Sequence, residues 1–392
     1  MQREPEAWHG RAQSAVVAAA AVVLVLVSQW LTITYNRQGQ WTALFCTGTD
    51  RALPERLDYE HVYRFPGPGF DGHYYHLIAH DPCFKRGLAA YVDDARLRYR
   101  RILLPATAHA LAFGNDRHVD TAYIALVLAW TGLGVYWCSR LAVMRGRHVA
   151  YGLAFLAIPA VIASADRMTM DVALLALCAA FARYQASTRA LFAVCLLAPL
   201  VRETGLLLPA AVSLHALLAR NGRKAAVFAA AAIPFLAWAA YVWHHTEAAA
   251  YPISHVPLSG IVTALVRPRP YLDKGPLIAQ LDQFADAMAL VGMLLALGLS
   301  AFWVRRDVSV VGTAGLLFAA MGVLLQRADH WYHVFDFGRV YSPLLMFLVV
   351  DEKTRGAASL APTALMYPRT ALQLGSQVTG VMIGVARSLG SS

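Results

Sequence analysis

The residues best suited to chemistry gather first in the stretch GFDGHYYHLIAHDP, residues 69–82. Acidic residues, three histidines and two tyrosines crowd into it, within a chain that is otherwise strongly apolar. Asp71 stands at the N-cap position of a short amphipathic helix that we expect from about residue 72 to 80. The Asp71 carboxylate either caps this helix or, beside the flexible Gly72, serves as a general base.

The three histidines of this stretch share one face of the expected helix. His73, His76 and His80 are spaced i, i+3 and i+7. With Asp71 and Asp81 nearby they could hold a divalent metal, because imidazole and carboxylate groups are common metal ligands. The alternative is that they are ordinary polar side chains of an interfacial helix. The first loop has no Asp-x-Asp and the chain has no His-Glu-x-x-His, so the sequence predicts no required cofactor and keeps a metal as the weaker alternative.

Arginines form a second group of candidates. The segment ARLRYRRILLP (95–105) contains Arg98 and Arg101, the turn VRETG (201–205) contains Arg202, and HVFDFGRVYSPLL (333–345) contains Arg339. A guanidinium group can hold a phosphate through two parallel hydrogen bonds, which makes these arginines candidates for phosphate binding. The alternatives are that they reach toward lipid headgroups, or that Arg202 pairs locally with its neighbour Glu203.

Four further residues are expected to support this group, namely Tyr99, Asp171, Glu203 and His76. Asp71, the arginines, Asp171 and Glu203 all fall at helix ends that we expect on the outer side. One outward-facing polar cavity could therefore collect them.

The composition identifies the class of protein that must position these residues. The chain has 392 residues, of which 58% are hydrophobic and 15% charged, and its mean hydropathy is +0.47. The apolar residues come in blocks of about 17–25, the length of a membrane-crossing helix. The net charge of +10 does not indicate nucleic-acid binding, because no lysine or arginine run of five or more occurs and the basic residues flank apolar blocks.

About ten apolar blocks predict an all-α polytopic membrane protein with about ten transmembrane helices. Basic residues follow every second block, which places those loops and both termini in the cytoplasm. The blocks lie at 14–34, 119–138, 148–165, 169–186, 187–201, 204–219, 224–243, 284–304, 308–325 and 338–350.

The chain is expected to form one membrane domain, residues 1–350, and a cytoplasmic tail, residues 351–392. The segment 35–118 is then a long first extracytoplasmic loop that contains the interfacial helix with Asp71. Its apolar part at 101–114 is too short to span easily and is interpreted as re-entrant or interfacial. The tail is expected to be poorly ordered or interfacial.

Two of the five cysteines, Cys46 and Cys83, fall in the long outer loop. If that face is oxidising, a disulfide between them is the expectation. The other three lie in apolar blocks and are interpreted as small buried hydrophobic side chains.

The order of these elements resembles the GT-C superfamily of integral-membrane glycosyltransferases. The matching elements are FDGHYYHLIA after the first span, RYRRILLP, the RETG tip and FGRVYSPL at the start of the last span. The chain is most similar to uncharacterised bacterial members and, more distantly, to the mannosyltransferases of GPI-anchor assembly. The resemblance covers most of residues 14–350 in topology.

This resemblance implies transfer of a sugar from a polyprenyl-phosphate carrier to a glycan, lipid or protein acceptor at the extracytoplasmic face of a bacterial inner membrane. The acidic residue of the first outer loop, here Asp71, would be the general base of an inverting reaction. The missing Asp-x-Asp argues against the metal-dependent branch of the superfamily. The chain also lacks the C-terminal soluble domain of larger relatives, so acceptor recognition is expected in the outer loops.

The rival hypothesis from another class is a transporter or lipid-handling membrane protein without chemistry. Transporters often show paired halves with helices interrupted near the midplane. Here the halves do not match, and the polar groups gather at one face. An assembly scaffold is a second rival, which would leave Asp71 and the Arg202–Glu203 pair without a role.

Overall fold

The computed structural model describes residues 3–390, apart from 56, 58–61, 248–255, 273, 305–308, 325–327 and 351–355. Within these residues the fold is almost entirely helical, which confirms the predicted all-α class. The described strands are two short ones, β1 (Thr47–Gly48) and β2 (Arg64–Phe65), which pair in parallel.

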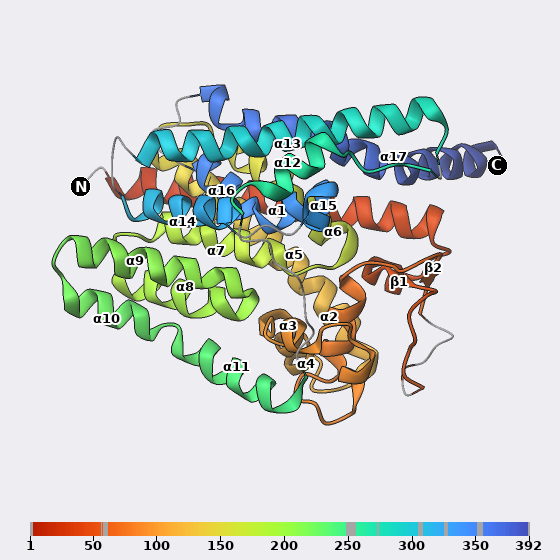
Figure 1. Ribbon diagram of the computed structural model, residues 1–392, viewed down its shortest axis with the longest axis horizontal. Coiled ribbons are helices and arrows are strands. Elements are labelled where there is room, and N and C mark those ends of the chain that lie inside the picture. Colours follow the sequence, from red (N-terminus) through yellow and green to blue (C-terminus); the bar gives the residue numbers. More distant parts are fainter. Residues whose placement is uncertain are drawn as a thin grey trace.

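Long helices form the frame of the molecule. Helices α1 (Arg3–Asn36), α13 (Pro276–Val304) and α17 (Ala361–Gly390) run along its long axis, and α5 (Asp116–Met144) packs against α1 (Figure 1). Small residues allow α1 and α5 to approach closely. A Cβ at Gly132 would lie 2.9 Å from a methyl group of Val22, and a Cβ at Gly10 would lie 3.0 Å from Arg140 Nη1.

Shorter helices fill the rest of the bundle. Helix α7 (Asp171–Arg183) lies at its centre between α5, α8 and α16, and its residues 171–182 are all buried. A helix that is apolar on every side is stable when neighbouring helices or lipid cover all of its faces, and here neighbouring helices do so. The others are η4 (Val149–Ala157), α6 (Pro159–Arg167), α8 (Thr188–Val201), η5 (Glu203–Leu206), α9 (Leu207–Leu218), α10 (Gly222–Ala230), α11 (Ile233–His245), α12 (Ser259–Val266), α14 (Val310–Leu324), η6 (Ala328–Tyr332), α15 (Val334–Val340), α16 (Ser342–Val350) and η7 (Gly356–Ser359).

The first loop folds into a cap of short elements at one end of the bundle. They are η1 (Trp41–Phe45), α2 (Gly72–His80), η3 (Leu88–Tyr91), α3 (Ala95–Arg98) and α4 (Leu103–Leu111). All nine residues of α2 are buried, and α2 packs on α4 and α5. Its first residue must be glycine, because a Cβ at Gly72 would lie 2.1 Å from the carbonyl oxygen of Arg167 at the end of α6. This contact seats the start of α2 directly against the bundle.

Within the described residues the predicted apolar blocks fall largely in helices, but the count of ten spans is not confirmed. Among the described residues, four helical stretches are long and apolar enough to cross a membrane, namely Gly10–Asn36, Asp116–Met144, Gly222–His245 and Pro276–Phe302. A fifth candidate is the pair η4 and α6, which is bent by 67°. The remaining apolar helices, among them Thr188–Val201, Glu203–Leu218 and Val310–Leu324, are shorter, and sequence hydropathy does not distinguish such helices from spans. The finding supports a membrane protein with several spanning helices.

The tail is a packed helix rather than a poorly ordered segment. Helix α17 lies along α13 and the end of α1. Asn36 Nδ2 donates to the Gln377 carbonyl oxygen at 2.9 Å, and the buried Arg369 Nε donates to Asp286 at 2.7 Å. The two ends of the described chain lie at opposite ends of the long axis (Figure 1). The placement of both termini in the cytoplasm stays a prediction.

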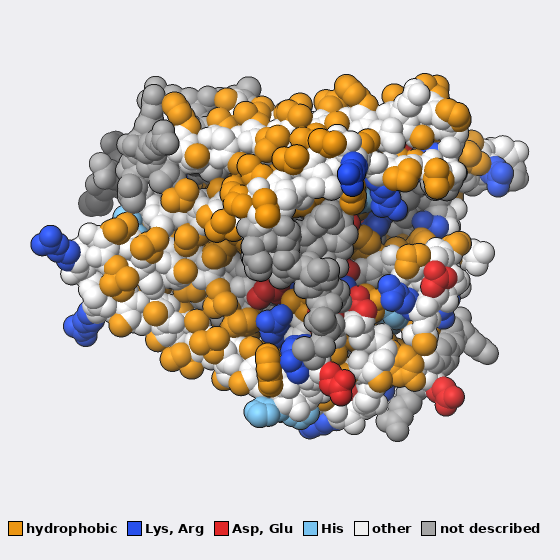
Figure 2. All heavy atoms as spheres, viewed as in Figure 1, with side chains coloured by type: hydrophobic (Ala, Val, Ile, Leu, Met, Phe, Trp, Pro, Cys, Tyr) orange, Lys and Arg blue, Asp and Glu red, His pale blue; other side chains and the backbone are white. Residues whose placement is uncertain are grey.

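The surface is divided between apolar and charged regions. Figure 2 shows apolar side chains over most of the face formed by α8–α11, α12 and α13, while charged side chains gather toward the cap that contains α2 and α3. Exposed large apolar residues occur along α11 and α13, as expected for a surface in contact with lipid. The cap is therefore the part of the described molecule in which to look for polar chemistry.

Candidate functional site

The Asp71 carboxylate is held by two arginines and does not cap α2. Asp71 occupies the N-cap position, but its side chain makes no capping hydrogen bond. Arg98 Nη1, from the last residue of α3, lies 2.9 Å from its Oδ1. Arg339, from α15, donates through Nη2 to its Oδ2. The first loop and the segment before α16, 268 residues apart, thus meet at this carboxylate.

The same ion-pair network continues into the bundle. Arg339 Nε lies 3.4 Å from Asp171 Oδ2 at the start of α7. Asp171 Oδ1 also accepts a hydrogen bond from Arg202 Nη1, at the end of α8. Arg339 therefore bridges Asp71 and Asp171, and a single network joins α2, α3, α7, α8 and α15.

A second ion pair involves Arg101 and Glu203. Arg101 Nε and Nη2 donate to the two carboxylate oxygens of Glu203, at 2.9 and 2.6 Å. Arg101 Nη1 donates to the Tyr75 hydroxyl at 2.8 Å. Sequence reasoning missed Tyr75, although it lies four residues after Asp71 and thus on the same helix face. We name the group of Asp71, Arg98, Arg101, Asp171, Arg202, Glu203 and Arg339 the arginine–carboxylate cluster.

Local backbone conformation explains why adjacent residues of VRETG have different partners. Helix α8 ends at Val201, and Arg202 is extended, with φ −158° and ψ 142°. Successive side chains point to opposite sides of an extended backbone. Arg202 consequently reaches Asp171 while Glu203, at the start of η5, reaches Arg101. The alternative that Arg202 pairs locally with Glu203 is therefore wrong, because each of the two residues pairs with a residue on another element.

Electrostatics keep Asp71 ionised. Burial by itself would raise the pKa of Asp71, but Arg339, Arg98 and Arg101 lower it far below its ordinary value. Burial would likewise lower the pKa of Arg98, and Asp71 is the main charge that raises it well above its ordinary value. While both arginines hold it, Asp71 is a charged but very weak base.

The cluster retains unused hydrogen-bond donors. Arg339 Nη1 and Arg202 Nε are buried without a hydrogen-bond partner. A buried guanidinium N–H without a partner costs free energy, and an anion placed between the two residues would remove that cost. The two groups are therefore hydrogen-bond donors that the described contacts leave unused.

Two predicted supporting residues lie outside the cluster. The ring of Tyr99 stacks on Phe84 at 4.1 Å, and its backbone oxygen accepts from Trp238 Nε1 at 2.7 Å. Tyr99 is thus a packing residue of the cap, and Tyr75 is the tyrosine that contacts the cluster. His76 stacks on Phe45 and contacts Asp120 of α5, so its described contacts lie away from Asp71.

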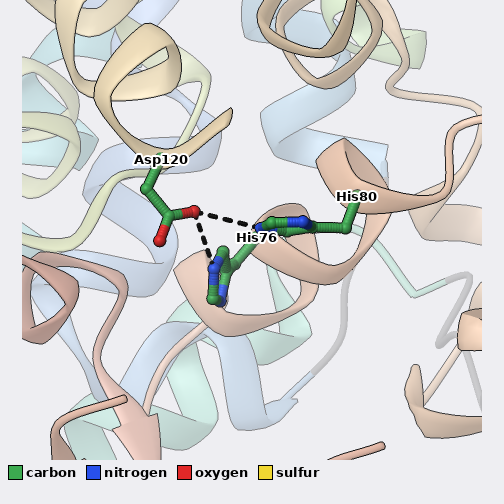
Figure 3. Close-up of side chains that lie close together, drawn as sticks. All are labelled: His76, His80 and Asp120. Atoms are coloured by element: carbon green, nitrogen blue, oxygen red, sulfur yellow. Dashed lines mark hydrogen bonds and ion pairs between the residues drawn. The ribbon is translucent and has the colours of Figure 1, made fainter. Parts of the chain in front are cut away.

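The three predicted metal-ligating histidines do not act as one set. His76 and His80 converge on Asp120, as Figure 3 shows, but His73 is not part of this group. His76 and His80 lie one turn apart, at i and i+4, and their ring centroids are 4.9 Å apart on one face of the helix. Asp81, expected near the histidines, instead accepts hydrogen bonds from the backbone N–H groups of residues 85, 86 and 88.

His73 is buried, and neither of its ring nitrogens has a hydrogen-bond partner. Burial lowers its pKa to about 3, and the charged or titratable groups around it are His76, Arg51, Arg64 and Asp93. The unfolded chain then binds a proton below about pH 6.5 that the folded chain does not bind until about pH 3. His73 therefore makes folding stability decline as the pH falls through this window.

Replacing His73 by phenylalanine is expected to flatten the loss of stability between about pH 6.5 and 4, because the apolar ring has no proton to gain. Unfolding of the purified protein in detergent, followed at a series of pH values, measures this. His118, an exposed histidine of α5, gives the matched control His118→Phe, which should retain the wild-type pH dependence. Equal pH profiles for wild type and His73→Phe would contradict the assignment.

The predicted disulfide is not formed. Cys46 and Cys83 are both free thiols. The Cys46 backbone contacts Phe70, just before α2, whereas Cys83 follows the end of α2 and its carbonyl oxygen accepts from the Tyr241 hydroxyl. A nine-residue helix spans about 13 Å, well beyond the separation that a disulfide allows. The interpretation of the other three cysteines as buried side chains agrees with the structure.

Comparison of the chain with family models, curated proteins and solved structures finds no match.

Proposed function

We propose that the protein is a membrane glycosyltransferase that moves a sugar from a polyprenyl-phosphate donor to an acceptor hydroxyl on a glycan, lipid or protein. The observation that carries this proposal is the position of Asp71, an ionised carboxylate held between Arg98 and Arg339 in a partly buried cluster. The cluster pairs a base candidate with the cations that a departing phosphate needs. The sequence resemblance to the GT-C superfamily supports the same assignment.

In the proposed reaction, the donor phosphate first competes with Asp71 for the arginines. Phosphate accepts bidentate hydrogen bonds from guanidinium groups, and the unpartnered Arg339 Nη1 and Arg202 Nε offer further donors. Asp71, released from part of its positive surroundings, then becomes a stronger base. Donor binding and base activation are in this way coupled through the same arginines.

Transfer then follows in a single displacement with inversion at the anomeric carbon. Asp71 takes the proton of the acceptor hydroxyl, and the acceptor oxygen forms the new bond to the anomeric carbon. The bond from that carbon to the phosphate oxygen breaks, and polyprenyl phosphate leaves with the negative charge. Arg98, Arg101, Arg202 and Arg339 stabilise that charge, each well-placed donor contributing about 3–4 kcal/mol.

The apolar helices would hold the polyprenyl chain and place the cluster at the membrane surface. We assign this surface to the extracytoplasmic face of a bacterial inner membrane, where the sugar would enter the cell envelope. The reaction as proposed requires no cofactor.

Purified protein in nanodiscs, offered a panel of radiolabelled polyprenyl-phosphate sugars with candidate acceptors, tests the proposal. The expected result is release of label from one carrier and its appearance in an acceptor. Donor binding followed by donor flux across vesicles, with no new glycosidic bond, would instead establish a transporter or lipid-handling protein. Absence of both binding and turnover across a broad panel would remove the glycosyltransferase assignment.

A further inference from the structure

A group of side chains separate from the arginine–carboxylate cluster joins α2 to α5. His76 Nε2 lies 2.8 Å and His80 Nε2 lies 3.2 Å from the same oxygen, Oδ1 of Asp120 (Figure 3). One ligand atom from each residue lies within 4.8 Å of the other two. Both histidines are buried, and Asp120 is 27% exposed, so the group is reachable from one side only.

The contacts of His80 call for a positive species, a proton or a metal ion, between its Nε2 and Asp120. A neutral imidazole has one N–H donor and one acceptor nitrogen. His80 Nδ1 lies 2.7 Å from Asp116 Oδ1, an acceptor, so the single hydrogen of the neutral ring belongs there. The Nε2 lone pair would then face an Asp120 lone pair at 3.2 Å, which is repulsive unless a positive species lies between them.

A surrounding set of contacts fixes the His80 ring in this orientation. Arg86 Nη1 and Nη2 donate to the two carboxylate oxygens of Asp116, at 2.6 and 2.7 Å. Arg86 Nη1 also donates to the His80 carbonyl oxygen at 3.1 Å. A histidine that donates its other N–H to a carboxylate is the usual arrangement behind a metal-bound imidazole.

We propose that His76 Nε2, His80 Nε2 and Asp120 Oδ1 bind a divalent transition metal, with Zn²⁺ as the preferred ion. Two histidines at i and i+4 on one helix, completed by a carboxylate from another element, are a zinc-binding arrangement. Mg²⁺ and Ca²⁺ prefer sites made of oxygen atoms, which this group does not provide.

The site would need only a small adjustment to hold the ion. Ligands about 2.1 Å from a tetrahedral zinc lie about 3.4 Å from one another. The distances from Asp120 Oδ1 to His76 Nε2 and His80 Nε2, 2.8 and 3.2 Å, are shorter than this by a few tenths of an ångström. A rotation of the partly exposed Asp120 carboxylate can lengthen both. Three protein ligands leave the fourth position for water on the open side of Asp120.

The proposed metal would act as a positioning device. Helix α2 has nine residues, with Asp71 immediately before its start and His80 at its end. A metal bridge from His76 and His80 to α5 would hold that end against the bundle, while Gly72 seats the other end against α6. The inference concerns binding and does not depend on the proposed transfer reaction.

Metal analysis of the full chain, purified in detergent without chelators and dialysed against micromolar Zn²⁺, tests the site. We expect about one tightly bound zinc per chain. His80→Asn and Asp120→Asn should each lower the bound zinc at least tenfold, and Asp116→Asn should weaken the affinity about 10–100-fold. His73→Asn, a buried histidine on the same helix but outside the group, should retain full occupancy.

A wild-type protein that takes up no zinc would overturn the proposal and leave a proton as the cation between His80 and Asp120. Equal zinc binding by wild type, His80→Asn and Asp120→Asn would also overturn it, because the ion would then lie elsewhere. If the substituted proteins do not fold, Co²⁺ added to the wild type gives the answer. A tetrahedral cobalt absorption band with nitrogen ligands supports the site, and its absence refutes it.

Discussion

Replacing Asp71 by asparagine is expected to lower the rate of glycosyl transfer by about 10²–10⁴-fold, the contribution of a positioned general base. The asparagine has nearly the same shape but cannot take the acceptor proton. Donor binding should be unchanged or tighter, because Arg98 and Arg339 no longer divide their hydrogen bonds between Asp71 and the phosphate. Label release from the carrier, measured beside equilibrium donor binding, separates the two effects.

Asp93→Asn is the matched control for this substitution. Asp93 also pairs with Arg98, with its oxygens at 2.9 and 3.1 Å, but among the described side chains it does not pair with Arg339. It should therefore change turnover much less than Asp71→Asn. Retention of full turnover by Asp71→Asn would remove Asp71 from the mechanism while leaving a transferase. Loss of donor binding with the rate would instead make Asp71 a structural part of the cluster.

Replacing Arg202 by methionine is expected to reduce the free energy of unfolding by about 3–5 kcal/mol. Arg202 and Asp171 are both buried, and removal of the guanidinium leaves Asp171 with only the longer contact to Arg339. Adding Asp171→Asn to this variant should recover much of the loss, because the uncompensated charge is then gone. Unfolding of the three proteins in mixed micelles by increasing SDS measures the difference.

Arg189→Met provides the control from the same helix. Arg189 lies in the first turn of α8 and is exposed, so its loss should change stability by less than about 0.5 kcal/mol. A single Arg202→Met variant as stable as the wild type would show that the pair is solvated. A double variant no more stable than the single one would show that packing, and not the charge on Asp171, causes the loss.

The sequence alone was sufficient to find the class of fold and the members of the cluster. The apolar blocks of membrane-crossing length predicted an all-helical protein, and the structure agrees. Charged residues at the ends of apolar blocks are costly unless they meet, which is why Asp71, Arg101, Arg202 and Arg339 could be selected before any contact was known. The structure brings all four into one polar region.

Three predictions were wrong or unconfirmed because they depended on packing. Hydropathy cannot separate a lipid-facing span from a short helix buried among others, so ten apolar blocks do not amount to ten confirmed spans. The tail, expected to be poorly ordered or interfacial, forms a helix that packs against α1 and α13, and its position at a membrane interface stays a prediction. The disulfide between Cys46 and Cys83 does not form because α2 lies between the two residues.

Which charges pair with which was decided only by the tertiary structure. Arg202 and Glu203 are neighbours in the chain, yet an extended backbone sends them to Asp171 and Arg101. Asp120 carries no signal that marks it in a single sequence, and Tyr75 is marked only by its spacing of four residues from Asp71. Each gains its role from a residue on another element. The positions of charged residues relative to the apolar blocks indicate where a charge can lie, because burying a charge costs free energy. Its partner is determined by helix packing, because two charges far apart in the chain interact only once the helices place them within a few ångströms.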